Sequence, residues 1–253
     1  MTRTRTSLVA LVVTSAFALG ACGGGADARP TLGERRVSGG PTTTTLAPYT
    51  SRIAAPIAAE VTVHTQPDAS SPAEEYPNPW PLDDDPDHVV PQVFLVVDQQ
   101  GPWVEVLLPV RPNGTTGWVR ARDVRLTQNY FRITVELAAH RITVYDGDTI
   151  MLQEPIAVGK AATPTPVGTY YLRVLLRAPD PNTVYGPFAY GLSGHSDVLT
   201  SFNGGDAELG IHGNNDASVL GTDASAGCIR MTNDGITRLA GILPLGTPVE
   251  ITP

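Results

Sequence analysis

The sequence is organised around two short stretches near its C-terminal end, Leu209-Gly-Ile-His-Gly-Asn214 and Ser225-Ala-Gly-Cys-Ile-Arg-Met231. Together they bring one histidine, His212, close in sequence to Cys228. A cysteine is a strong nucleophile as the thiolate, and a neighbouring imidazole lowers the pKa of the thiol and can later return the proton. The glycines around the pair suit a tight backbone whose N–H groups could hold an oxyanion. The two stretches therefore predict a cysteine acyl-transfer enzyme.

The composition favours β-structure and turns over long helices. Of the 253 residues, 25 are Gly and 23 are Pro, and 17% are charged. This length allows one or two domains, each with a core. The formal net charge is −8, and Lys160 is the only lysine. The sequence therefore lacks the cationic cluster that neutralises phosphates, and we expect no nucleic-acid partner.

The N-terminus has the pattern of an export signal. A short basic region with Arg3 and Arg5 precedes a mostly apolar run that is too short to span a membrane comfortably. The run ends in Leu19-Gly-Ala-Cys22, which resembles the bacterial lipobox, where the cysteine becomes the first mature residue and is acylated through sulfur. We expect residues 1–21 to be a lipoprotein signal peptide and Cys22 to anchor the protein to the cell membrane, facing the cell wall. An ordinary signal peptide that contains a cysteine is the alternative.

The second cysteine is then left without a disulfide partner. The sequence has 2 cysteines, so a lipidated Cys22 leaves Cys228 as a lone thiol. A lone thiol in an exported protein is either buried and inert or reactive, and the surroundings of Cys228 favour a reactive one. Residues 22–55 are rich in Gly, Pro, Thr and Ala and cannot bury enough apolar surface to order themselves. They predict a flexible tether.

Residues 56–127 predict a small β domain. Four short runs have strand character, with the hairpin turn signal Asn113-Gly114 between the last two: Val61–Val63, Gln92–Val97, Trp103–Leu108 and Gly117–Arg120. The pattern from Trp103 to Val124 resembles a bacterial SH3-like barrel. Acidic, proline-rich residues 73–87 interrupt the domain. Because the spacing of an EF-hand calcium loop is absent, they predict a solvated loop.

Residues 128–253 predict a second, mainly β domain. Alternation in Phe131–Leu137 and Arg141–Tyr145 predicts an antiparallel meander. Thr163-Pro-Thr-Pro-Val-Gly168 predicts a stiff turn before a long strand, and Gly246–Ile251 predicts a closing strand. Thr232 is a candidate N-cap for one short helix. Neither a zinc-finger spacing nor a phosphate-binding glycine loop stands out, so the sequence predicts no metal site and no cofactor.

Four motifs of this second domain together resemble the L,D-transpeptidase catalytic domain, also called YkuD-like. They are Thr163–Tyr170, Gly210–Gly213, Ser225–Met231 and Gly246–Ile251. Their order, their spacing and the ending of the chain all agree with that family. Together with the first domain, the resemblance implies a mainly β fold. We expect an SH3-like β-barrel followed by a β-sandwich-like catalytic domain with one or two short helices.

The resemblance implies that Cys228 is the nucleophile and His212 the base that activates it. The substrate would be the peptidoglycan stem peptide. The thiolate would attack the carbonyl of the third stem residue, a diamino acid, release the terminal D-alanine and form a thioester. The amine of a neighbouring stem would then attack, giving a 3→3 cross-link. The expected partners are thus a donor and an acceptor stem, and we expect a monomer.

Two other functions stay open at this point. Water in place of the amine would make the same site an L,D-carboxypeptidase. A wall-binding lipoprotein with a decayed catalytic domain is the third possibility, and the intact pair of Cys228 and His212 argues against it.

The roles of the other residues near the pair are less direct. Three of them are expected to support the loop or the oxyanion: Gly213, Ser225 and Gly227. Arg230 is expected to bind a substrate carboxylate or to brace the loop, and His195 to contact substrate or to be structural. Ala226 stands where many family members have a second histidine. That difference leaves His212 as the one nearby base.

Overall fold

The computed structural model describes residues 49–82, 85–202 and 205–253. These residues belong to one compact unit. The predicted signal peptide (residues 1–21) and residues 22–48 of the predicted tether lie outside the described residues, whereas residues 51–55, the end of that tether, belong to a paired strand, β1 (Ser51–Pro56). Within the described ranges, none of the helices has the length and apolar character needed to cross a membrane.

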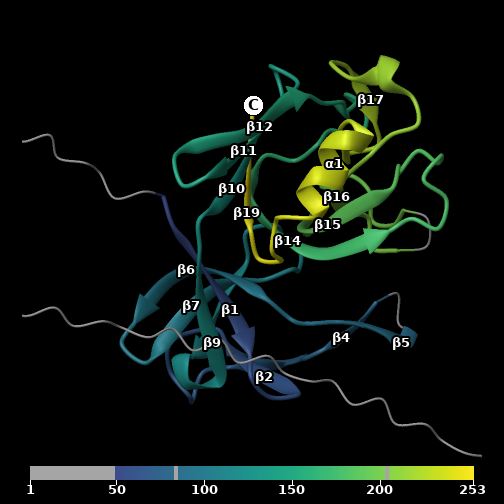
Figure 1. Ribbon diagram of the computed structural model, residues 1–253. Helices are drawn as coiled ribbons and strands as arrows, with labels where there is room; N and C mark the ends of the chain where they lie inside the picture. The colour runs from purple at the N-terminus through teal and green to yellow at the C-terminus, as the bar shows by residue number, and fades with distance from the viewer. Residues whose placement is uncertain (1–48, 83–84, 203–204) are drawn as a thin grey trace, which may run out of the picture. The chain divides into compact units, whose positions relative to one another are not determined.

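Residues 51–129 form a β-structure that is called here the N-terminal module (Figure 1). In the described part of the chain its main sheet has seven strands, in the order β3-β2-β8-β7-β6-β1-β9. The strands are β1 (Ser51–Pro56), β2 (Glu60–His64), β3 (Ala73–Pro77), β6 (Phe94–Gln100), β7 (Trp103–Leu107), β8 (Thr116–Arg120) and β9 (Val124–Asn129). A 3-10 turn (Ala121–Asp123) precedes β9. Alternating apolar side chains of these strands, among them Val61, Phe94 and Val104, close over one core.

The prediction of a solvated loop over residues 73–87 is wrong. β3 pairs with β2 from Glu60↔Pro77 to His64↔Ala73, and β4 (Trp80–Leu82) forms a separate hairpin with β5 (Asp85–Val90). β3 lies at the edge of its sheet, with its acidic side chains Glu74 and Glu75 exposed. Charged residues are common on edge strands, so an acidic composition indicates exposure to solvent without excluding strand pairing.

Residues 131–252 form the C-terminal module around a second sheet. As far as the chain is described, this sheet has eight strands in the order β12-β11-β10-β19-β14-β15-β16-β18. They are β10 (Phe131–Glu136), β11 (Arg141–Asp146), β12 (Thr149–Pro155), β14 (Gly168–Arg177), β15 (Phe188–His195), β16 (Glu208–His212), β18 (Ile229–Arg230) and β19 (Pro248–Thr252). The last strand, β19, lies inside the sheet, parallel to β10 and antiparallel to β14.

One α-helix is present among the described residues, α1 (Asn233–Ala240), as the sequence predicts. Thr232 caps it, because its hydroxyl accepts a hydrogen bond from the Gly235 N–H at 2.9 Å. Ile236 and Leu239 of this helix are fully buried against the apolar face of the sheet. A short parallel pair, β13 (Val158–Gly159) with β17 (Asp223–Ser225), and a 3-10 turn (Ala217–Val219) complete the module. The mainly β fold with a short helix is confirmed.

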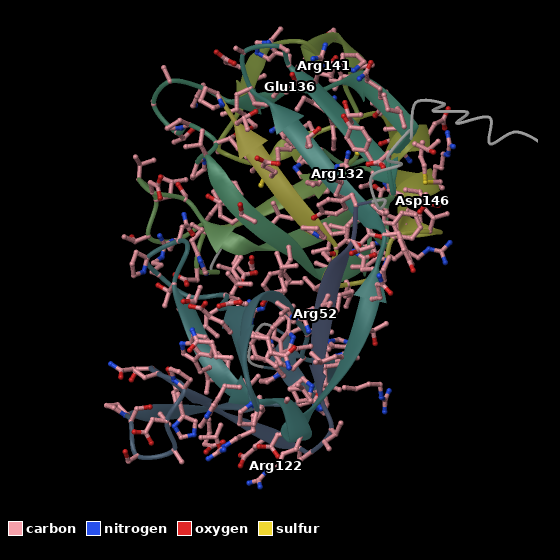
Figure 2. The ribbon with its side chains drawn as sticks, turned by 90° about the vertical axis from the view of Figure 1, so that its left-hand side faces the viewer. Arg52, Arg122, Arg132, Glu136, Arg141 and Asp146 are labelled. Carbon is pink, nitrogen blue, oxygen red and sulfur yellow. The ribbon has the colours of Figure 1, made fainter. Side chains whose placement is uncertain are left out.

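The β10–β11 hairpin shows how the register is held at the surface (Figure 2). Glu136 lies opposite Arg141, and the guanidinium donates to both carboxylate oxygens at 2.7 and 2.8 Å. Near the other end of the hairpin, the guanidinium of Arg132 stacks on its cross-strand neighbour Tyr145, 4.1 Å from the ring centre. Facing pairs of this kind stabilise one register over its neighbours.

Candidate functional site

Neighbouring strands bring Cys228 and His212 together. β16 ends at His212 and β18 begins directly after Cys228, and the two strands pair in parallel with Ile211 opposite Ile229. The side chains of both residues line the same small cavity of about 70 Å³ and the same larger groove of about 580 Å³. In the structure, the two residues that the sequence predicts as a catalytic pair therefore line one cavity.

His212 is held in one orientation and one tautomer. Its side chain is 3% exposed, and Nδ1 lies 2.7 Å from the carbonyl oxygen of Gly213. A carbonyl only accepts, so Nδ1 carries the proton and Nε2 has the free lone pair. The ring of Tyr185 packs on the imidazole with ring centres 5.0 Å apart. Neutral His212 is thus oriented to accept a proton through Nε2.

Burial keeps the imidazole neutral. Burial, which has the largest effect, and the positive charge of Arg230 together lower the pKa of His212 from 6.5 to about 4. The backbone carbonyls of Gly213 and Val184 act in the opposite direction, because they accept hydrogen bonds from the protonated ring. His212 is a weak base at rest, with two carbonyls available to stabilise the imidazolium once it forms.

The thiol of Cys228 is also neutral at rest. Burial raises its pKa above the ordinary 9.0, and a backbone hydrogen bond from Gly210 and the charge of Arg230 offset part of that rise. The expectation that a neighbouring imidazole lowers the thiol pKa is wrong for this resting state. An uncharged, buried His212 supplies no positive charge to favour the thiolate.

The loop before Cys228 is fixed by two hydroxyl groups. The hydroxyl of Ser225 donates to the carbonyl of Cys228 at 2.6 Å and accepts from the Gly227 N–H at 3.0 Å. The hydroxyl of Thr165 donates to the carbonyl of Gly227 at 2.8 Å and accepts from the Gly159 N–H at 2.8 Å. Thr165 belongs to the two-proline motif, so this motif braces the cysteine loop from a distant part of the chain.

These contacts change two of the predicted roles. The Gly227 N–H is engaged by Ser225, so it is not positioned as an oxyanion donor. The Gly213 N–H donates to the carbonyl of Phe188 at 3.2 Å, while its own carbonyl holds His212. Gly213 therefore orients the imidazole. Ser225 has the loop-supporting role that the sequence suggests.

Arg230 and His195 have different surroundings. Arg230 lines the small cavity with Cys228, and in the described part of the chain its buried Nε has no hydrogen-bond partner. His195 lies outside the lining of both the cavity and the groove. It is buried, with Nε2 3.2 Å from a carboxylate oxygen of Asp206, and burial lowers its pKa. This position supports the structural role of His195 over substrate contact.

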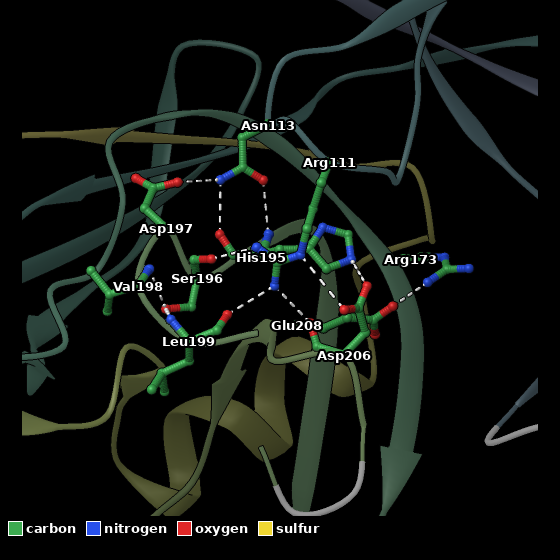
Figure 3. Close-up of polar contacts among 10 residues, drawn as sticks. All are labelled: Arg111, Asn113, Arg173, His195, Ser196, Asp197, Val198, Leu199, Asp206 and Glu208. Carbon is green, nitrogen blue, oxygen red and sulfur yellow. Dashed lines mark hydrogen bonds and ion pairs between the residues drawn. The ribbon is translucent and has the colours of Figure 1, made fainter. Parts of the chain in front are cut away.

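The N-terminal module takes part in the wall of the site (Figure 3). From the β7–β8 loop, the guanidinium of Arg111 donates to three backbone carbonyls of the β15–β16 connection at 2.6, 3.0 and 2.9 Å: Ser196, Leu199 and Asp206. From the same loop, the amide of Asn113 accepts from the His195 N–H and donates to the His195 carbonyl, both at 2.8 Å. Ser196 and Leu199 line the small cavity beside Cys228.

Sequence reasoning missed several residues of the site. Tyr185, Phe202 and Glu208 line both the cavity and the groove. Each comes from a connection, or from a short strand without a clear alternating pattern, so only the folded chain reveals its position. Among the described residues, no cluster of three or more His, Cys, Asp or Glu side chains could hold a metal ion.

Known proteins share this domain. The family model of the L,D-transpeptidase catalytic domain (YkuD) matches residues 130–251. The L,D-transpeptidase YkuD of Bacillus licheniformis is 37% identical over 123 residues, which are 49% of this chain and 66% of that protein. Its counterpart in Bacillus subtilis is 35% identical over 121 residues, 48% of this chain and 65% of that protein. The solved structure of Bdellovibrio bacteriovorus Bd1075 is 26% identical, covers 49% of this chain and 48% of that chain, and has a TM-score of 0.39.

The family match is thus confined to residues 130–251, the part of the chain that contains both His212 and Cys228. The matched segment covers slightly less than two thirds of the Bacillus relatives and about half of this chain.

Proposed function

We propose that the protein is a peptidoglycan L,D-transpeptidase that forms 3→3 cross-links through a thioester on Cys228. The family assignment of residues 130–251 supports the reaction class. The observation that carries the assignment of roles is the tautomer of His212 that the Gly213 carbonyl favours, which leaves the lone pair on Nε2 of a residue lining the same cavity as Cys228. A thioester intermediate divides one difficult amide exchange into two easier steps.

In the first step, the thiol attacks the carbonyl of the third residue of the donor stem. Because both groups are neutral at rest, the thiol proton passes to His212 Nε2 as the carbon–sulfur bond forms. The imidazolium donates to the carbonyls of Gly213 and Val184 while it persists. It then gives the proton to the leaving amine as the carbon–nitrogen bond breaks and D-alanine departs.

The developing oxyanion needs a donor other than the Gly227 N–H, which Ser225 occupies. We assign this role to the N–H of Cys228, since the hydroxyl of Thr165 holds the carbonyl of Gly227, which shares one peptide plane with that N–H. In the second step, an acceptor amine attacks the thioester, His212 takes its proton, and the thiol leaves as the new amide forms. Neither step requires a metal or a cofactor.

The location belongs to the same proposal. The lipobox-like Leu19–Cys22 supports acylation of Cys22, which would hold the enzyme at the outer face of the cell membrane. The SH3-like character of the N-terminal module is likewise proposed from its sequence pattern. A peptidoglycan substrate is consistent with an enzyme outside the membrane.

Mass spectrometry of muropeptides incubated with the purified protein tests the proposal. We expect dimers joined 3→3 and released D-alanine. Trimmed tripeptides without dimers would indicate the carboxypeptidase, and unchanged muropeptides would indicate a non-catalytic wall-binding protein. Cys228→Ala should abolish every product, whereas Ser218→Ala, an exposed position outside the cavity lining, should retain them.

The nucleophile can also be tested without a stem peptide. A carbapenem-type β-lactam should acylate Cys228 and give one adduct in an intact-mass measurement. The adduct should be absent from Cys228→Ala and present in Ser218→Ala. A modified Cys228→Ala protein would show that another residue is the nucleophile.

A further inference from the structure

The groove beside Cys228 is built by both modules. On one side it is lined by Trp80, Pro81 and Leu82 of the hairpin β4–β5, and on the other by residues 205–210. In Figure 1 this hairpin reaches out from the N-terminal sheet on the side of β14 and β15. The hairpin has no predicted role, and the proposed chemistry at Cys228 does not use it.

The floor of the groove is the face of the sheet that is turned away from the core. Tyr190 and Ile211 project into the core, while their neighbours Gly191 and Gly210 line the groove. The two glycines face each other across the β15–β16 ladder. A Cβ at Gly191 would lie 2.7 Å from Val174 Cγ1, and one at Gly210 would lie 3.8 Å from Cys228 Sγ. At Gly191 the side chain of Val174 fills the place of a Cβ, whereas at Gly210 the absence of a side chain leaves the backbone open to a peptide beside the thiol.

The accessible charge in the groove is negative. Among the residues that the structure describes, its charged lining consists of Arg173, Asp206 and Glu208. Arg173 is the least accessible: its guanidinium lies 3.8 Å from the ring centre of Trp80, pairs with Glu208, and has a side-chain exposure of 15%. Asp206 lies 3.6 Å from the guanidinium of Arg111, but its side chain is 62% exposed against 36% for Arg111, and that of Glu208 is 31% exposed. Glu208 Oε2 would lie 3.9 Å from a Cβ on Gly191, so it reaches over the floor.

We propose that this groove binds the second substrate, a peptide that carries a primary amine. The inference rests on the proposed transpeptidase function. The ammonium group is held near Glu208 and Asp206 and loses one proton to solvent on its way to the thioester. The amine nitrogen then forms the new carbon–nitrogen bond, the carbon–sulfur bond breaks, and the second proton returns through His212 to the thiol. The hairpin β4–β5 forms one wall of this acceptor site.

Binding to the inactive Cys228→Ala protein tests the site without turnover. The probe is a tripeptide that ends in a diamino acid with a free side-chain amine. We expect Glu208→Gln and Leu82→Lys to weaken its binding about tenfold each, and Leu82→Glu to leave it unchanged or tighter. Leu82→Lys and Leu82→Glu place opposite charges at one half-buried position. If either substitution acted only by damaging the hairpin, both variants would bind the tripeptide more weakly, and to a similar degree. Glu60→Gln, which neutralises an exposed carboxylate outside the groove, is the control.

Half-reactions of the active enzyme separate this inference from the proposed function. With the donor stem alone, release of D-alanine and the thioester mass should be the same in wild type and Leu82→Lys, because Leu82 lies outside the lining of the small cavity. Only the amine concentration needed for cross-linking should rise. Equal tripeptide binding by all variants, or a loss of thioester formation in Leu82→Lys, would overturn the acceptor site. If the wild-type enzyme formed no thioester, the proposed transpeptidase function would be overturned. The binding test on the Cys228→Ala protein would still show whether the groove holds the tripeptide.

Discussion

At the scale of single residues, Cys228 and His212 resist charge for the same reason. His212 is buried and Cys228 is half-buried, so the thiolate and the imidazolium both cost desolvation free energy when they form alone. A preformed ion pair is therefore disfavoured. A transfer that creates both charges together, with a substrate carbonyl in place to take the negative charge, avoids an isolated buried ion.

Neutral His212 should make stability depend on pH. The pKa of about 4 in the folded state lies below the unfolded value of 6.5, so the unfolded chain binds more protons between these pH values. His212 therefore costs the protein up to about 3 kcal/mol of unfolding free energy as the pH falls from 6.5 to 4. Urea unfolding at several pH values should show this loss in wild type and a smaller one in His212→Gln. Parallel curves for the two proteins would contradict the burial argument.

Arg230 should tune the reactivity of the thiol. Its positive charge lowers the pKa of Cys228 against the larger effect of burial. In Arg230→Gln the thiolate loses this support, so the alkylation rate with iodoacetamide should rise only at higher pH than in wild type. Arg230→Lys keeps a charge and should lie between the two. An unchanged pH profile in Arg230→Gln would mean that the guanidinium does not act on the thiol.

At the scale of elements, the N-terminus of α1 is tied to the strand that carries His212. The side-chain oxygen of Asn233 accepts from the Asn214 N–H at 2.8 Å, next to Gly213. A Cβ at Gly213 would lie far inside the contact distance of that oxygen and 3.0 Å from the Cα of Gly186. The helix thus fixes the carbonyl that orients the imidazole.

Gly213→Ala should disturb both stability and activity. The methyl group has no free space, so overpacking should cost about 1–3 kcal/mol of unfolding free energy and shift the carbonyl that holds His212. We expect the turnover rate to fall more than the binding of donor stem. Gly241→Ala is the matched control, because this glycine has φ −84° and its added Cβ would meet nothing closer than 3.5 Å. Equal thermal denaturation of both variants and wild type would contradict this account.

The strands that the sequence predicts are those with regular alternation. β10, β11 and β14 follow from their apolar periodicity, and the cap of α1 follows from Thr232. β15 and β16 carry glycines where other strands carry side chains, so their pattern is weak although they form the floor of the groove. Their place in the sheet depends on the pairing of distant segments, which a local pattern does not encode.

For the candidate site, too, some features can be predicted from the sequence and others only from the structure. Cys228 and His212 follow from residue type and spacing, because thiol and imidazole chemistry restricts which residues can serve. The engagement of the Gly227 N–H by Ser225 and the burial of the thiol are three-dimensional facts. They depend on which hydrogen-bonding groups already have partners in the folded chain, and a local sequence pattern does not indicate those partners.

At the scale of the whole molecule, the N-terminal module acts on the site through direct contacts. Leu95 and Leu107 of that module pack with Tyr171 of β14 in one buried cluster. The hairpin β4–β5 lines the groove, and Arg111 holds the connection that walls the cavity. The module therefore forms part of the walls of the candidate site.

Substitutions of Arg111 test directly whether the N-terminal module holds the wall of the site in place. Its guanidinium holds three backbone carbonyls of the β15–β16 connection, and a single ammonium group lacks the planar set of donors that this needs. Arg111→Ala and Arg111→Lys should both speed amide hydrogen exchange in residues 196–202. Both should also raise the KM for the donor stem several-fold with a smaller change in kcat. Arg122→Ala removes a guanidinium that is 81% exposed and paired only with its neighbour Asp123 among the described residues, so it should change neither. Unchanged exchange in Arg111→Ala would show that the connection keeps its shape without the N-terminal module.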